Sequence, residues 1–518
     1  MSSVWYEDKA INLKSEECDD AFDSRDSKLL LKLSEECRLL AENKSLHKMI
    51  QAKYYFDSFT CLSNYLEIEK ISGKKREETI EKILYLCRTG LILLEEYRNE
   101  KSMDELEKAQ YNGVYYTTIV NYCNILSHIG RLPKAMHTIR PIAAQGFGMA
   151  IGNLAMELYD YSKFDYDTGH QQVLLEKVCV LLKEAISHPN IYVHEMAKKR
   201  FQELLFSILG NEAIEEKIEK LPSAEFLNIN KFDTKYDSLE LMNSEEQNYK
   251  KWVSFKCLSL NTLNDVDYSL DISYDPIHLP NMLASLEEKH PRYHGLFNQI
   301  KQEYCSARYM IYDGIFNSKH HFSDAEVYLV NTLDYPVYSY NIEKVKSAYR
   351  TIYSLFDRIA FFLNEYFSLG IAKDRVSFGA IWRKNSRLHE IATSNYLLGA
   401  LHWIKKDLYK NSVSEYEEYI DPILHRTYEI RNVMEHRYLK ILDNSFHLDN
   451  KQDSDELAFV ITIEEFHDLA INLLRTCREA IILLVMAINI EEKRKYKELG
   501  EKFIPSISLS SYDDEWKF

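Results

Sequence analysis

Residues 421–440 read DPILHRTYEIRNVMEHRYLK, a pattern that predicts a helix opening at Asp421. Pro422 stands in the first turn of this helix, where its missing N–H does no harm. From His425 to Lys440 the segment holds four Arg or Lys against two Glu, an excess of two positive charges in a chain of formal net charge -16. Cations collected on one helix of an acidic protein indicate an anionic partner, which we interpret as RNA phosphate.

The spacing of Arg431 and His436 has a structural and a functional interpretation. In the structural one, Arg431 forms an i,i+4 surface ion pair with Glu435, and His436 is a half-buried ring with a hydrogen-bond partner. In the functional one, the guanidinium binds phosphate through its two-pronged donor geometry, and the imidazole transfers protons near neutral pH. An R-x4-H spacing occurs by chance in many helices, so the spacing alone does not decide between them.

The longer pattern Arg431-Asn432-x3-His436-x-Tyr438 resembles the R-N-x3-H-x-Y signature of the HEPN superfamily, small helical domains many of which are metal-independent RNases. The surroundings, from Trp252 to about Glu492, resemble a HEPN subfamily that follows an array of TPR-like repeats. The resemblance implies attack by the RNA 2'-OH, with a 2',3'-cyclic phosphate and a 5'-OH as products. It implies Arg431, Asn432 and His436 as catalytic residues, with no metal and no cofactor.

Further residues are candidates for supporting roles. Some HEPN domains carry a functional acidic residue on their second helix, and Asp357 is the candidate here. Arg437 is a second accessory candidate, and Arg426 and Lys440 are candidates for substrate binding. Tyr438 is the third accessory candidate, because the tyrosine at this place is modified in some HEPN toxins that are silenced by nucleotidyltransferase antitoxins. The alternative for Tyr438 is a ring that packs in a helix interface.

The two main candidates do not share one face of a regular helix. Five residues turn an α-helix by about 500°, which leaves Arg431 and His436 roughly 140° apart. Two arrangements bring them together. In one, two copies of the chain pack across a two-fold axis and form a composite site, as is typical of HEPN RNases. In the other, Arg431 lies in an irregular first turn and its side chain reaches round.

Length and composition limit the class of protein. A chain of 518 residues is expected to contain two or three domains, and 28% charged residues are typical of a folded soluble protein. Nine scattered Cys without a CxxC pair predict buried thiols in a reducing compartment. The first residues do not resemble a secretion signal, and the longest apolar run is too short for a membrane helix. We therefore expect a cytoplasmic protein that does not bind membranes.

Helical periodicity predicts an all-α fold with a repeat array in its N-terminal half. Residues 115–146 show helix, glycine turn and a helix opening with Ala135, which resembles one TPR unit. The expected domains are a TPR-like region at 1–210, a linker at 211–250, a HEPN-like bundle at 251–500 and a flexible tail at 501–518. Helices are expected over 27–69, 344–367 and from 462 to about 497, and residues 439–442 and 457–461 are expected to pair as a short β-hairpin.

Two functional hypotheses follow. In the first, the chain is a HEPN endoribonuclease with a toxin-like or anti-phage role, acting as a homodimer or higher homo-oligomer on RNA. Its repeat region then binds a trigger or regulatory protein, since concave repeat surfaces bind partners. In the alternative, the HEPN-like half is a catalytically silent dimerisation or nucleotide-binding module, and the repeat region binds a partner. The complete Arg-Asn-x3-His pattern favours the first hypothesis.

Overall fold

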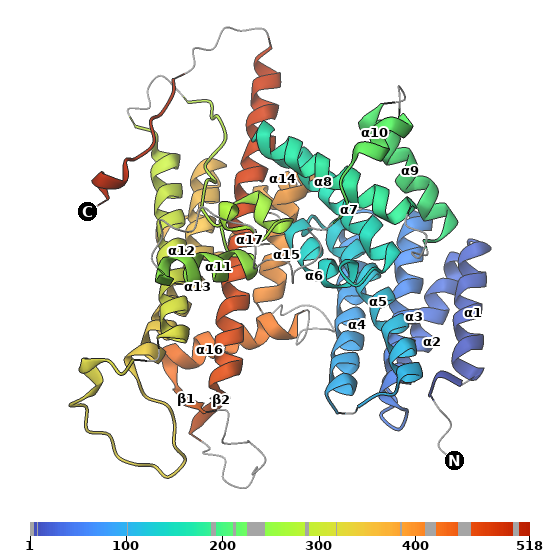
Figure 1. Cartoon of the computed structure of the whole chain (residues 1–518), viewed down its shortest axis with the longest axis horizontal. Coiled ribbons are helices and arrows are strands. Elements are labelled where there is room, and N and C mark those ends of the chain that lie inside the picture. The colour runs from blue at the N-terminus through green and yellow to red at the C-terminus, as the bar shows by residue number, and fades with distance from the viewer. Residues whose placement is uncertain are drawn as a thin grey trace.

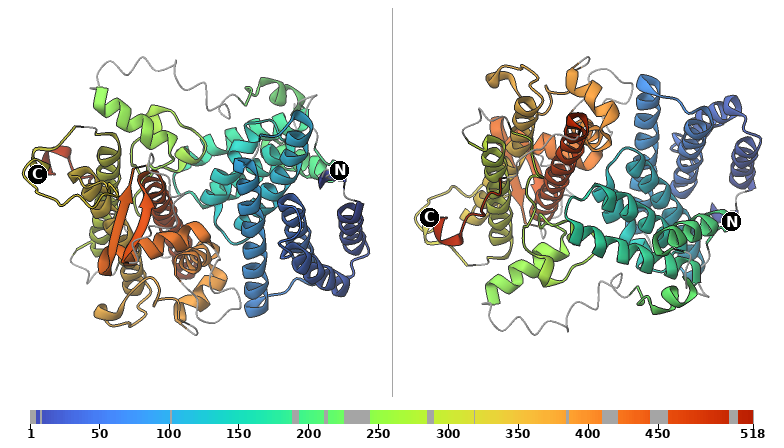
Figure 2. Two further views of the ribbon diagram at one scale, coloured as in Figure 1. Left: turned by 90° about the horizontal axis from the view of Figure 1, so that it is seen from below. Right: turned by 90° about the horizontal axis from the view of Figure 1, so that it is seen from above.

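The computed structural model describes residues 5–7, 9–100, 102–187, 193–210, 214–224, 244–284, 290–317, 319–383, 386–409, 421–443, 457–500 and 507–517. They form two helical halves that lie side by side (Figures 1 and 2). The all-α prediction is confirmed, with a small two-stranded sheet at one end of the C-terminal half.

The N-terminal half is a row of helices in which each packs against the next (Figure 1). They are α1 Lys9–Asp23, α2 Ser27–Ala41, α3 Lys48–Glu69, α4 Gly73–Glu100, α5 Glu105–His128, α6 Leu132–Ala143, α7 Gly148–Phe164, α8 Thr168–Ser187, α9 Glu195–Leu209 and α10 Ile214–Lys220. The helix expected over 27–69 is two helices, because the Asn43 side chain accepts from the Ser45 amide and forms a turn between them. The resemblance of this half to TPR repeats stays a prediction.

The C-terminal half is a bundle around one long helix. Its helices are α11 Ser244–Phe255, α12 Arg292–Phe316, α13 Tyr340–Tyr366, α14 Arg387–Ser394, α15 Tyr396–Leu408, α16 Pro422–His436 and α17 Ile463–Leu499. Helix α17 contacts α12, α13, α15 and α16, and its middle is buried almost throughout from Ala480 to Ile488. Its start is fixed by Thr462, whose hydroxyl accepts from the Glu465 amide, as the sequence predicts.

The expected β-hairpin is corrected by the structure. Strands β1 Tyr438–Leu442 and β2 Ala458–Thr462 pair, but they run parallel, with Tyr438 opposite Ala458 and Leu442 opposite Thr462. The connection over 443–457 exceeds the roughly dozen residues that a parallel crossover needs, so no tight turn forces an antiparallel pair. Pro336 forms an isolated antiparallel bridge with Leu442 on the other edge of β1.

Buried ion pairs join the two halves. Asp407 of α15 accepts hydrogen bonds from Arg88 of α4 at 2.9 Å and from Arg131, beside α6, at 2.7 Å. Arg131 also donates to Glu479 of α17 at 2.6 and 2.7 Å. The Arg131 and Asp407 side chains are each only 1% exposed. Buried charges are tolerated only when they are paired in this way, so these ion pairs hold the two halves in one relative position.

The hydrophobic core is also shared. Buried apolar side chains from Ile11 in α1 to Ile488 in α17 form one contiguous cluster. Tyr396 of α15 donates to the Ser127 carbonyl, and its backbone approaches Gly130 so closely that a Cβ there would meet the Tyr396 oxygen at 2.8 Å. Gly130 has φ +82°, so both its conformation and this contact favour glycine.

Two predicted segments, the linker and the tail, lie only partly within the described residues. Of the expected 211–250 linker, residues 211–213 and 225–243 lie outside the described part, while α10 and the start of α11 fall within it. Of the expected tail, 501–506 and 518 lie outside it, and Asp514–Trp516 form a 3-10 turn.

All nine cysteines are free thiols and eight are buried, as expected. Among the described residues, no helix is long and apolar enough to cross a membrane.

Candidate functional site

Helix α16 carries the Arg-Asn-x3-His pattern and is fixed at its first turn by Asp421. The Asp421 carboxylate accepts from the amides of Ile423 and Leu424 at 3.1 and 3.3 Å, which caps the helix directly before Pro422. Four buried residues at three-residue spacing form its inner face against the bundle. They are Leu424, Thr427, Ile430 and Val433. Arg431 and Asn432 therefore lie beside this buried face, and His436 lies beyond its last residue, Val433.

Arg431 and Asn432 are half-buried on the flank of α16. The Arg431 guanidinium donates to Asn432 Oδ1 at 3.0 Å and lies 5.4 Å from the centre of the Tyr353 ring on α13. Tyr353 in turn contacts Tyr409, with 6.0 Å between the ring centres. Burial raises the pKa of the Tyr353 hydroxyl, and Tyr409 adds to this shift. Arg431 thus lies against a neutral aromatic wall and is hydrogen-bonded to the neighbouring amide, and the catalytic role of Asn432 stays a prediction.

Asp357 lies one turn after Tyr353 on α13 and is close enough to Arg431 to be affected by its charge. Its Oδ1 accepts from the Phe378 amide at 2.8 Å, which fastens the 376–382 loop to α13. Burial raises the pKa of the Asp357 carboxyl, while the Phe378 amide and Arg431 partly oppose that shift. The structure thus brings the predicted accessory carboxylate to Arg431, and its functional role stays a prediction.

His436 is the last residue of α16 and is exposed. Arg437 follows as the helix C-cap, also exposed, with its amide donating to the Val433 carbonyl. Tyr438 opens β1 and its side chain is exposed, which contradicts the alternative of a ring packed in a helix interface. Its hydroxyl shares a 2.9 Å hydrogen bond with the Tyr338 hydroxyl, and this bond raises the pKa of Tyr438 to about 12.

The structural interpretation of the Arg431–His436 spacing is also wrong. Glu435 pairs with Arg350 of α13 at 3.1 Å, whereas Arg431 donates to Asn432. His436 is exposed instead of half-buried. Helix α16 is regular from Pro422 to His436, so Arg431 does not lie in an irregular first turn. The angular separation expected from an ideal helix therefore holds within one copy of the chain.

The two predicted substrate-binding cations are engaged with carboxylates. Arg426 donates to Glu465 at 3.1 Å, and its guanidinium lies 4.3 Å from the centre of the Phe459 ring. Lys440 is buried in β1 and paired with Asp334. Binding of RNA phosphate by Lys440 would require displacement of Asp334, so its role stays a prediction.

Three neighbours of the pattern were not identified from the sequence. Tyr353 lies against Arg431 and contacts Tyr409, and Arg350 contacts the end of α16 through Glu435 and the Met434 carbonyl. Tyr353 could have been found, because it precedes Asp357 by one helical turn. Arg350 and Tyr409 come from segments that sequence spacing does not relate to α16.

A segment over residues 322–340, which begins with the 3-10 helix Phe322–Asp324 and leads into α13, projects from the bundle beside the end of α16 (Figure 1). It connects to β1 through Val337, whose amide donates to the Ile441 carbonyl at 2.8 Å, and to Tyr438 through Tyr338. Its most exposed apolar side chains are Phe322, Tyr328, Val330 and Leu333. Soluble surfaces rarely collect large apolar side chains in this way unless another molecule covers them.

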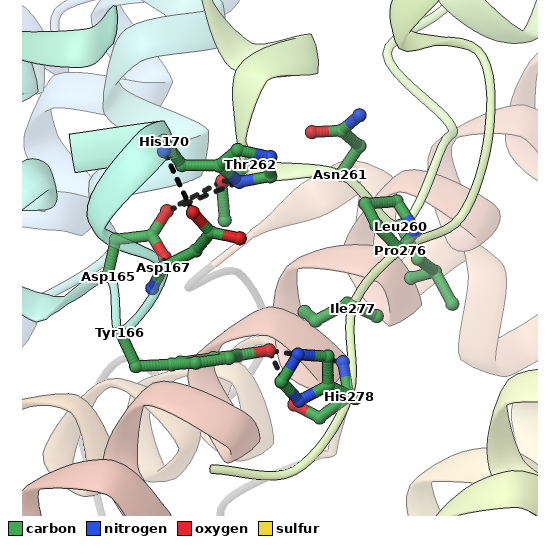
Figure 3. A pocket seen from close by; sticks show the side chains of 10 residues that line it. All are labelled: Asp165, Tyr166, Asp167, His170, Leu260, Asn261, Thr262, Pro276, Ile277 and His278. Atoms are coloured by element: carbon green, nitrogen blue, oxygen red, sulfur yellow. Dashed lines mark hydrogen bonds and ion pairs between the residues drawn. The ribbon is translucent and has the colours of Figure 1, made fainter. Parts of the chain in front are cut away.

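A polar hollow at the edge of the joint between the halves is not a candidate site (Figure 3). Thr262 donates to Asp165 at 2.7 Å and contacts His170 Nδ1 at 2.8 Å, while Tyr166 donates to the His278 carbonyl. These groups satisfy one another, and the hollow has a volume of only about 20 Å³, roughly the room of one water. Their hydrogen bonds connect the loop after α7 to the segment that leads into the bundle.

No group of three or more His, Cys, Asp or Glu within the described ranges is arranged to hold a metal ion.

The C-terminal half is a helical bundle, and its helix α16 carries the Arg-Asn-x3-His pattern. Residues 285–491 match the family described as LA2681-like HEPN, which supports HEPN superfamily membership for this part of the chain. HEPN domains are generally associated with RNases. Comparison with curated proteins and with solved structures gave no match.

Proposed function

We propose that this protein is a metal-independent endoribonuclease whose HEPN site contains Arg431, Asn432 and His436. The observation that carries the proposal is their placement in a HEPN domain: an exposed imidazole ends the same helix on which a neighbouring amide orients an arginine. A helix serving only to pack the bundle needs neither feature. The HEPN family context suggests a toxin-like or anti-phage role.

The reaction requires proton transfer and charge stabilisation, since RNA supplies its own nucleophile. The 2'-oxygen attacks the adjacent phosphorus and the bond to the 5'-oxygen breaks, which leaves a 2',3'-cyclic phosphate and a 5'-OH. His436 takes the proton of the 2'-OH and a histidine returns one to the departing 5'-oxygen. Arg431 stabilises the negative charge that grows on the phosphate oxygens.

We further propose that the active form is a homodimer with a composite site. Arg431 and His436 face about 140° apart on a regular helix, so one copy does not direct both at one phosphate. The exposed apolar 322–340 segment is joined to Tyr438 through Tyr338, and a second copy would cover it there. Two copies then supply two arginines and two histidines to one cleft.

The N-terminal array is suited to control this site, because it contacts the start of the same helix. Lys134 of α6 pairs with Asp421, the capping residue of α16, and Arg88 of α4 lies 3.7 Å from the same carboxylate. A trigger protein that moves the array would act on this cap first.

The test is an RNA cleavage assay on total tRNA and rRNA with EDTA present. We expect cleavage by the wild type to end in a cyclic phosphate, and losses of about 10²–10⁴-fold in His436→Ala and about 10²–10³-fold in Arg431→Ala. His425→Ala, on the same helix outside the pattern, is the matched control. Full cleavage by folded His436→Ala would overturn the assignment of the site.

Mixed dimers test the composite site separately. Differently tagged Arg431→Ala and His436→Ala chains, co-expressed and purified through both tags, carry one intact Arg431 and one intact His436 on different copies. Partial recovery of cleavage is expected for a composite site, and no recovery would place both residues of each site on one chain. A folded wild type that neither cuts RNA nor harms cells on overexpression would favour the alternative, a silent dimerisation or nucleotide-binding module.

A further inference from the structure

A second cavity, of about 180 Å³, lies between the array and the bundle, away from Arg431 and His436. Its walls come from α6, from the first turn of α16, from α17 and from two residues that lead into the bundle, Cys257 and Asp265. Cavities of roughly 150 Å³ hold a ring-sized molecule, so this one has room for a small ligand. Ile423, on its rim, is about half exposed, which places the opening at the surface.

Three cations, Lys134, Arg475 and Arg478, and three carboxylates, Asp265, Asp421 and Glu479, line this cavity. Lys134 pairs with Asp421 and Arg478 with Asp265, while Glu479 pairs with Arg131, which lies outside the lining. All three carboxylates are therefore engaged by cations other than Arg475.

Among the described residues, Arg475 is the lining cation that has no carboxylate partner. Its guanidinium donates to the Lys256 carbonyl at 3.3 Å and to Asn472 Oδ1 at 2.9 Å, and neither of these acceptors is charged. Burial lowers the pKa of Arg475, which is the physical sign of a cation that lacks a counter-charge. An arginine remains protonated nonetheless, so the Arg475 guanidinium can still bind an anion.

His137 of α6 adds an unsatisfied polar group. Its Nδ1 atom is buried and has no hydrogen-bond partner in the described structure. Burial holds the pKa of His137 well below its usual value, and Arg475 lowers it further, so the ring is neutral. A buried polar atom without a partner costs free energy unless a ligand or water satisfies it.

We propose that this cavity is a binding site for a small molecule that carries a phosphate group, with Arg475 as its principal ligand-binding residue. The guanidinium can donate two parallel hydrogen bonds to phosphate oxygens, and the neutral His137 ring can donate a third. Lys134, partly exposed in the same wall, supplies a second positive charge. The free phosphate ion and the phosphate of a nucleotide share this chemistry, and the experiment separates them.

An occupant of this site would act on the helix that carries the RNase pattern. The cavity wall includes Asp421 and Leu424 of the first turn of α16, and Lys134 would be shared between Asp421 and the ligand. The inference does not depend on RNA cleavage, because binding is measured on the protein itself.

The test is titration of the full-length protein by calorimetry and thermal unfolding with inorganic phosphate and, separately, with adenosine monophosphate, against chloride at equal ionic strength. We expect saturable binding that raises the melting temperature. Tighter binding of adenosine monophosphate would identify a nucleotide site, and equal or tighter binding of phosphate a free-anion site. Arg475→Gln should weaken binding at least about tenfold, and Arg475→Lys should retain part of it.

Arg494→Gln is the matched control, because Arg494 lies on the same helix but is exposed and paired with Glu491. It should bind as the wild type does. The proposal is overturned if both probes stabilise no more than chloride, or if folded Arg475→Gln binds as tightly as Arg494→Gln. Should Arg475→Gln fail to fold by circular dichroism, His137→Phe, which removes the donor and fills the cavity, should abolish binding instead.

Discussion

The two ends of helix α16 differ sharply in their surroundings. At the N-terminal end, Asp421 is buried and contacts Lys134 and Arg88, which come from the other half of the protein. At the C-terminal end, His436 and Arg437 are exposed beside an apolar segment that nothing in the described structure covers. One end is therefore held by contacts within the chain, and the other is open to solvent in the described structure.

This difference predicts that stability and the proposed activity depend on opposite ends of a single helix. Charges buried at the joint contribute to stability only while every member keeps its partner, so the joint is sensitive to any single loss. Exposed pairs at the other end exchange protein partners for water at little cost. Substitutions at the N-terminal end should mainly alter folding, and substitutions at the C-terminal end mainly function.

The largest effect is expected from Asp407→Asn. This change removes the charge that Arg88 and Arg131 share and leaves two buried guanidiniums short of a counter-charge. Breaking a buried ion pair costs about 3–5 kcal/mol, so the free energy of unfolding should fall by that amount. Urea denaturation measures it, and a loss below about 1 kcal/mol would show that the joint is hydrated and only weakly coupled.

Acid should weaken the same end of the helix. Burial raises the pKa of Asp421, but Lys134 and Arg88 outweigh it and hold that pKa below the ordinary carboxyl value of about 4. The contribution of this carboxylate is thus complete above about pH 4 and is lost as pH falls further towards the folded-state pKa. Asp421→Asn keeps the helix cap but removes the charge, so between pH 5 and 3 its denaturation midpoint should vary less than that of the wild type. If the denaturation midpoint changed equally with pH in the two proteins, this prediction would be contradicted.

A smaller effect is expected at the exposed end from Glu435→Gln. The pair between Glu435 and Arg350 is about two-fifths exposed at the arginine, and such pairs contribute about 0–1 kcal/mol. The same denaturation experiment should show a change within that range. If Glu435→Gln lowered the free energy of unfolding as much as Asp407→Asn does, the two ends of the helix would not differ in their contribution to stability.

The smallest effect is expected from Tyr438→Phe. It removes one hydrogen bond between two exposed hydroxyls, those of Tyr438 and Tyr338, and should cost under about 1 kcal/mol. Tyr338→Phe is the matched partner, and the double variant should lose no more than either single one, because both singles break the same bond. Losses that add fully would show that the two tyrosines act through other contacts.

Helical periodicity predicted most of the fold correctly. The segments around α13, α16 and α17 were located to within a few residues, because their apolar positions recur at helical spacing and Pro422 and Thr462 mark helix starts. The strands β1 and β2 were located as well, but their parallel pairing was not. A five-residue strand carries the same alternation in either direction, and only the path of the chain between strands sets the orientation.

The candidate site was predicted only in part. The resemblance of the pattern on α16 to the HEPN signature named Arg431, Asn432 and His436, and all three lie on that helix. The aromatic wall at Tyr353 and Tyr409 is formed by other elements that converge on Arg431, which no local pattern in the sequence records.

The sequence by itself determined which segments are helical and which helix carries the HEPN pattern, because these follow from periodicity, capping residues and a local motif. Tertiary structure alone decided that Arg88, Arg131 and Lys134 of the array reach the carboxylates of the bundle, and that Arg475 is left without one. The physical reason is that charges attract at contact distance irrespective of their separation along the chain. Which charge is paired, and which is left over, is therefore fixed only when the two halves pack together.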